Sequence, residues 1–180
     1  IHSFPTRRSS DLVFAISTSA QNTTFNEGDK VLNLGLGIGS TLYTGSAFGS
    51  SIPPLSASLE FNVKDELFDE YSSIGVGGYL GYASYNYTLT GSDYGFSNFI
   101  LGARGALHYQ FIEQLDTYAG LLLGFNIVSW NADEFSSAAS GGFLSAFYIG
   151  GRYYFNENIA GMLELGYGIA YLNIGVAFKF

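Results

Sequence analysis

Four charged side chains stand in the middle of segments that are otherwise mostly uncharged: Glu60, Arg104, Arg152 and Glu164. Apolar residues flank them at alternate positions, so each charge shares one side of its segment with small or polar residues. Opposite charges that leave water together must pair, because an unpaired buried charge is very costly. We therefore predict one polar network that contains all four residues. Arg152 and Glu164 are expected to pair across the short turn between their segments.

His108 joins this predicted network, because it lies on the same side of its segment as Arg104. A general base needs a partner that orients it, and the chain offers no His-x-Ser pairing. The chain has no cysteine, and its other histidine is His2, so a typical zinc site cannot be built. We predict a hydrogen-bonded structural histidine, with no catalytic residues, metal or cofactor.

The composition indicates the surroundings of these side chains. Charged residues make up 12% of the 180 residues and hydrophobic residues 47%, against roughly 25% charged residues in soluble domains. Most of the exterior must therefore face something other than water. A spanning helix needs about 20 consecutive apolar residues, and the best stretch, 161–178, contains Glu164 and Asn173. A membrane protein without such helices must be a closed barrel. The net charge of −8 argues against nucleic acid as a partner.

Apolar and polar residues alternate in eight segments, which is typical of two-faced strands. The expected strands cover 30–39, 55–64, 74–82, 99–111, 117–130, 147–155, 159–168 and 172–180. One side of every segment is free of charge, and the other side holds the charges in mid-segment. An Arg or Lys that faces lipid costs about 2–4 kcal/mol near the midplane. This separation of charged from uncharged positions is therefore the one expected for strands with one side facing lipid.

The connections between these segments alternate in character. Polar stretches at 41–54, 88–97 and 131–141 alternate with shorter, mostly acidic ones at 64–71, 112–116 and 156–158. This fits a meander with short turns in the periplasm and longer loops outside. With both termini at the periplasmic end, the strand number must be even. We predict an all-β fold, an eight-stranded antiparallel up-and-down transmembrane β-barrel over residues 30–180.

The residues before the barrel are of three kinds. Residues 1–12 contain HSFPTRRSSDL, which resembles the translation of a sequencing adapter and is interpreted as an artefact. Residues 13–20 resemble the end of a signal peptide, with small residues at Thr18 and Ala20. Residues 21–29 are predicted to be an N-terminal periplasmic segment.

Aromatic residues stand near the ends of the expected strands, on the charge-free side. Membrane barrels carry an aromatic girdle at each interface. The predicted girdle residues are Phe61, Tyr109, Phe111, Tyr153 and Phe155 toward the inner ends, and Tyr82, Trp130 and Tyr167 toward the outer ends.

Several stretches resemble the small outer-membrane barrels of the OmpA/OmpX-like superfamily, the outer membrane protein beta-barrel domain. They are 102–109, 115–120, 151–155 and 164–168. The most specific is the C-terminal VAFKF, which resembles the signal read by the barrel-assembly machinery, with Val176, Phe178 and Phe180 at alternate positions. The resemblance implies insertion by that machinery into the bacterial outer membrane, among lipid and lipopolysaccharide. Barrels of this size are usually monomers.

Such a fold does not name a function. The leading hypothesis is a non-catalytic barrel with a side-chain-filled polar lumen, which serves envelope integrity or surface interaction through its extracellular loops. The alternative is a narrow, porin-like channel for ions or small solutes, with the charged network as its gate. An eight-stranded barrel is just wide enough for side chains to fill it. Bulky lumen candidates such as Tyr79, Tyr148 and Tyr154 also count against a wide pore.

Overall fold

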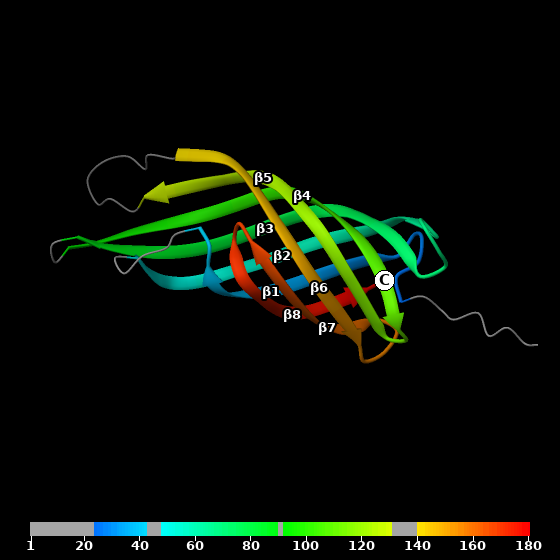
Figure 1. Ribbon diagram of the computed structural model, residues 1–180. Helices are drawn as coiled ribbons and strands as arrows, with labels where there is room; N and C mark the ends of the chain where they lie inside the picture. Colours follow the sequence, from blue (N-terminus) through cyan, green and yellow to red (C-terminus); the bar gives the residue numbers. More distant parts are fainter. Residues whose placement is uncertain (1–23, 43–47, 90–91, 131–139) are drawn as a thin grey trace, which may run out of the picture.

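The computed structural model describes residues 24–42, 48–89, 92–130 and 140–180. Its eight strands follow one another around a closed antiparallel barrel (Figure 1). The strands are β1 (Lys30–Ser40), β2 (Phe48–Asp65), β3 (Ser72–Leu89), β4 (Ser92–Ile112), β5 (Leu115–Trp130), β6 (Ser140–Tyr154), β7 (Ile159–Tyr167) and β8 (Ala170–Lys179). The predicted eight-stranded meander is confirmed. No helix in the described ranges is long and apolar enough to cross a membrane. The adapter-like residues 1–12 and the signal-like residues 13–20 lie outside the described residues.

The first and last strands close the barrel. β1 pairs with β8 from Val31 opposite Lys179 to Ser40 opposite Ala170. Lys30 and Phe180 extend the seam by exchanging two backbone hydrogen bonds of 3.1 and 3.0 Å. The start of β1 therefore lies beside the C-terminus, at the end of the barrel that also carries the β2–β3, β4–β5 and β6–β7 turns (Figure 1). In barrels of this kind the end with short turns is the periplasmic one, and we call it the inner end.

Alternation along each strand creates two unlike faces. Outward-facing apolar side chains stay exposed, such as Leu101 at 55% and Ile149 at 58%. The charges at Glu60 and Arg152 are completely buried in the lumen. A water-soluble barrel would have the opposite arrangement. The exterior is therefore built to face lipid.

The strands differ in length at the outer end. β2, β3 and β4 have 18, 18 and 21 residues, whereas β7 and β8 have 9 and 10. The β3–β4 hairpin consequently reaches far beyond the β7–β8 hairpin (Figure 1). Beyond the pair Leu36–Leu55, β2 pairs with β3 alone. Beyond the pair Phe147–Tyr167, β6 pairs with β5 alone.

This extension corrects the expected outer loops. Residues 48–54 belong to β2, β3 and β4 continue through 88–89 and 92–97, and β6 begins at Ser140. The expectation was wrong because these Ser-, Gly- and Tyr-rich stretches lack a continuous apolar side. Outside a bilayer a hairpin needs no such side, and cross-strand pairs can stabilise it. Phe96, which falls in the expected connection 88–97, is buried in β4 and stacks on Tyr85 with ring centroids 5.7 Å apart.

Candidate functional site: the charged lumen

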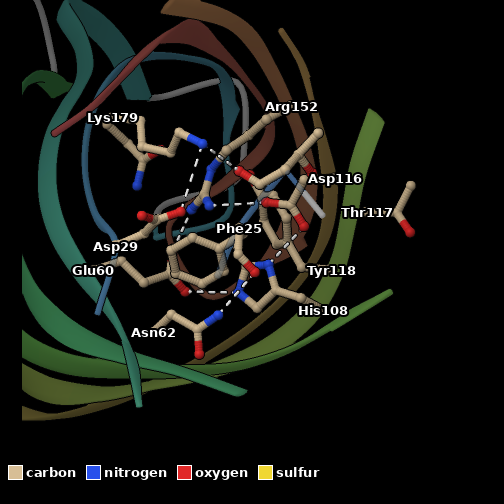
Figure 2. Close-up of polar contacts among 12 residues, drawn as sticks. Phe25, Asp29, Glu60, Asn62, His108, Asp116, Thr117, Tyr118, Arg152 and Lys179 are labelled. Atoms are coloured by element: carbon tan, nitrogen blue, oxygen red, sulfur yellow. Dashed lines mark hydrogen bonds and ion pairs between the residues drawn. The ribbon is translucent and has the colours of Figure 1, made fainter. Parts of the chain in front are cut away.

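Four ionisable side chains near the inner ends of their strands meet in the lumen (Figure 2). We call Glu60, His108, Asp116 and Arg152 the inner layer; they come from β2, β4, β5 and β6. The Arg152 guanidinium donates to Glu60 through Nη2 and to Asp116 Oδ2 through Nη1, the latter at 3.0 Å. His108 lies between the same two carboxylates, with Nδ1 2.8 Å from Asp116 Oδ1 and Nε2 3.1 Å from Glu60 Oε1. Each carboxylate therefore faces both cationic side chains.

The hydrogen bonds also indicate the charge of His108. An ionised carboxylate can only accept hydrogen bonds, so both ring nitrogens must donate. Only the imidazolium carries a proton on both nitrogens. With His108 charged, two cations balance two carboxylates, and the inner layer is neutral as a whole. The four residues are at most 3% exposed to solvent. Because an unbalanced charge is costly in such a buried place, the inner layer needs this balance.

A second ion pair, which we call the outer layer, lies farther along the lumen. Arg104 Nη2 on β4 and Glu164 Oε1 on β7 are 2.7 Å apart. Arg104 also donates from Nε to the Tyr148 hydroxyl at 2.9 Å and from Nη1 to Ser58 Oγ at 3.2 Å. The Tyr118 hydroxyl donates to Glu164 Oε1 at 2.9 Å. Neutral hydroxyl groups, together with the Asn173 amide that donates to Glu164 Oε2 at 3.3 Å, thus surround a single ion pair.

Tyr118 lies between the two layers and contacts both. Its ring centroid is 5.2 Å from that of His108, and the Arg152 guanidinium carbon is 4.6 Å from the Tyr118 centroid. Its hydroxyl reaches the other way, to Glu164. The two layers and Tyr118 consequently form one continuous polar and aromatic plug across the lumen.

The pairing differs from the one predicted. Arg152 and Glu164 are diagonal neighbours by register, with Arg152 opposite Met162 and Gly150 opposite Glu164. Among the described ion pairs, however, Glu164 pairs with Arg104, and Arg152 pairs with Glu60 and Asp116. The expected pair was wrong because long side chains in a narrow barrel meet across the lumen, and their relative height depends on the stagger of the whole sheet.

Asp116 is the network member that the sequence reasoning missed. It had been placed in an acidic turn, but it is the second residue of β5 and 2% exposed. A usable signal was present, because Asp116 shares the inward parity of Tyr118. It also lies directly opposite Arg152 in the β5–β6 register.

Glycines on the inward face provide the space for this network. A Cβ atom on Gly75 would lie 2.7 Å from Glu60 Oε1 and 3.0 Å from His108 Nε2. On Gly150 it would lie 2.8 Å from Glu164 Cγ. The alternation of glycine with apolar residues in these strands thus makes room for the long lumen side chains.

The remaining predicted residues lie on the exterior. Of the predicted girdle, the described side chains are all outward-facing: Phe61, Tyr82, Tyr109, Phe111, Tyr153, Phe155 and Tyr167. The hydroxyls of Tyr109 and Tyr153 donate to Asp69 and Gln114 in the inner turns, each at 3.1 Å. This is the amphipathic placement expected at a membrane interface. The side chain of Trp130 lies outside the described part, and Tyr82 lies well inside β3 rather than at its outer end. Val176, Phe178 and Phe180 also face outward.

Comparisons with known proteins support the fold. No family model and no curated protein matches the chain. Ail of Yersinia pestis, in complex with the heparin analogue sucrose octasulfate, matches 86% of this chain and 99% of its own at 10% identity and a TM-score of 0.55. A de novo designed transmembrane β-barrel matches 86% of this chain and 98% of its own at 17% identity and a TM-score of 0.51. Ail in a nanodisc matches 86% and 100%, at 13% identity and a TM-score of 0.50. Identities this low bear on the fold alone, and the chain therefore has the fold of the small eight-stranded barrels of the bacterial outer membrane.

Proposed function

We propose that the protein is a non-catalytic outer-membrane barrel, closed by its own side chains, that contributes to envelope integrity and contacts partners at its outer end. The observation that carries the proposal is the inner layer, in which Glu60 and Arg152 are fully buried and paired. A water-filled channel would separate such groups and hydrate them. Breaking one buried pair costs about 3–5 kcal/mol when a charge is left without a partner. Spontaneous opening is therefore unfavourable.

The environment of His108 supports a non-catalytic role. A general base needs a free nitrogen lone pair within reach of the proton it abstracts. Both His108 nitrogens face carboxylates, and the side chain is 2% exposed. His108 therefore acts as a charge-balancing member of the plug.

The outer end is the surface offered for contact. There, β2 to β6 continue beyond the β7–β8 hairpin. The Ail structure contains a heparin analogue, and binding of such a polyanion depends on cationic side chains. This chain has no Lys or Arg in 41–54, 83–98, 129–146 or 166–171. The outer end thus suits an uncharged or cationic partner, and we expect no retention of the refolded protein on immobilised heparin at physiological salt.

Single-channel conductance of the full chain in a planar bilayer tests the closed lumen. The protein is refolded in detergent, and its insertion is verified by co-flotation with vesicles of the same lipid. We expect no openings, since the two layers fill the cross-section. Steady openings in the unaltered protein would instead establish the narrow channel for ions or small solutes. Openings that appear only in Arg152→Ala would support the plug, because Arg152 joins two strands across the lumen.

A further inference from the structure

The described part of the N-terminal segment, residues 24–29, is hydrogen-bonded to the inner end of the barrel. Residues 24–29 belong to no strand, and they fold back across the inner end of the lumen before β1 begins at Lys30. Figure 2 shows Phe25 in the middle of the inner layer, close to Arg152 and His108. We call residues 24–29 the mouth segment. Among the described residues, it lies between the inner layer and the periplasm.

Hydrogen bonds attach the mouth segment to separate strands around the rim. The Thr24 backbone N–H donates to Gln110 Oε1 on β4 at 2.7 Å, and Lys179 Nζ on β8 donates to the Thr24 carbonyl at 3.0 Å. Asn62 Nδ2 on β2 donates to the Phe25 carbonyl at 2.9 Å. β2, β4 and β8 lie apart in the strand order. The attachment therefore spans the mouth and exists only once the barrel has closed.

Phe25 is the part of the segment that enters the lumen. Its side chain is buried, at 3% exposure, and its ring centroid is 4.6 Å from that of His108. The Arg152 guanidinium carbon lies 5.6 Å from the Phe25 centroid. An aromatic ring favours nearby cations through its quadrupole. Its apolar body also excludes water, which strengthens ion pairs behind it.

We propose that the mouth segment is a tethered stopper, with Phe25 as its head, that occupies a binding site at the inner mouth and controls access from the periplasm to the inner layer. The site consists of a floor, formed by the side chains of His108 and Arg152 in the neutral inner layer, and a rim of hydrogen-bonding groups. Gly28 and Asp29 are joined to Asn62 on β2 by two backbone hydrogen bonds. The attachments at Thr24, in contrast, are hydrogen bonds with the side chains of Gln110 and Lys179 that are only partly buried. Such contacts open more readily than the barrel unfolds. The stopper therefore lifts without loss of the barrel.

A single-cysteine reporter tests this access. The chain has no cysteine, and Ser73 is buried beside Phe25, His108 and Gln110 at the inner mouth. In the full-length Ser73→Cys protein, the rate of labelling by a charged methanethiosulfonate reagent is measured with and without Phe25→Ala. We expect slow labelling with Phe25 present. With Phe25→Ala the labelling rate should rise about tenfold or more. The free energy lost when a buried aromatic ring is removed is larger than the free energy that corresponds to a tenfold change in the equilibrium between closed and open states.

Three further variants in the Ser73→Cys protein serve as controls. Phe111→Ala removes the same ring from the lipid-facing side of the inner end, where Phe111 is 72% exposed, and should leave the rate unchanged. Arg104→Met opens the outer layer while keeping the stopper, and should also leave labelling slow. Gln110→Leu removes the acceptor of Thr24 but keeps the ring, and should give an intermediate rate. This last variant also tests the proposal if Phe25→Ala fails to fold.

The outcomes separate the stopper from the closed lumen. Fast labelling in folded Phe25→Ala supports the stopper, whether or not the barrel conducts. Equal labelling rates with and without the Phe25→Ala change, in a barrel that still folds, would overturn it. Fast labelling in Arg104→Met with Phe25 in place would also overturn it, because access would then come from the outer end.

Discussion

The inner and outer layers of the lumen both bury charged side chains, but they compensate these charges in different ways. In the inner layer, two carboxylates and two cations form a closed ring in which each charge faces two of the opposite sign. In the outer layer, a single ion pair has only neutral neighbours, the hydroxyls of Ser58, Tyr118 and Tyr148 and the amide of Asn173. Losing one cation of the ring removes a partner from both carboxylates at once and leaves the ring one charge out of balance. Losing one member of the outer pair leaves a single charge that keeps neutral hydrogen-bond partners.

The largest effect is therefore expected from Arg152→Met. The change leaves Glu60 and Asp116 with His108 as their shared cation, and we expect a loss of about 3–5 kcal/mol in the free energy of unfolding. The measurement is urea-induced unfolding of the full chain in lipid vesicles, followed by the fluorescence of the chain's one tryptophan, Trp130. An unchanged midpoint would mean that the inner layer does not hold the barrel together.

Arg104→Met should cost less, near the lower end of the range of about 3–5 kcal/mol for breaking a buried ion pair. Glu164 would still accept hydrogen bonds from Tyr118 at 2.9 Å and Asn173 at 3.3 Å. The same unfolding measurement on both arginine variants compares the two layers directly. If Arg104→Met were as destabilising as Arg152→Met, the distinction between ring and single pair would fail.

Gly75→Ala tests how tightly the inner layer is packed. The new methyl group would lie 2.7 Å from Glu60 Oε1, and overpacking of this kind costs about 1–3 kcal/mol. Gly78→Ala is the matched control on the same strand, since a Cβ atom there meets nothing within 4 Å. Vesicle unfolding should show a clear loss for Gly75→Ala and little change for Gly78→Ala. Equal behaviour of the two variants would show that the inner layer adjusts freely.

The smallest effect is expected near the outer end, from Tyr85→Phe. The Tyr85 hydroxyl donates to Ser40 Oγ at 2.7 Å, and a net hydrogen bond contributes about 0.5–1.5 kcal/mol. The ring that stacks on Phe96 is kept. We expect hydrogen exchange of the β3–β4 backbone amides to become faster near Tyr85, while the inner half of the barrel stays unchanged. A global loss of protection would contradict the separation between the two ends.

Local pattern was sufficient for the inner part of every strand and for the lumen-facing parity of Glu60, Arg104, His108, Arg152 and Glu164. The side-chain period of a strand is two, so alternation alone assigns a residue to the lumen or to lipid. The exclusion of charge from one side also identified the surroundings, because lipid penalises charge strongly at each position. These are properties of single strands, and neighbouring residues in the sequence carry them.

Only the tertiary structure decided which lumen side chains form ion pairs with one another. Glu164 turns to Arg104 instead of Arg152, and Asp116 enters the ring, because the stagger of all eight strands sets the height of each side chain in the lumen. The sequence did not predict that β3 and β4 extend beyond the lipid. Two strands that pair in water do not need an apolar face, so no alternating pattern marks the extension. Phe25 crosses the mouth for a similar reason: its partners come from β4 and β6, and only barrel closure brings them together. Alternation along the sequence thus determined which side chains face inward, and closure of the sheet determined what they meet there.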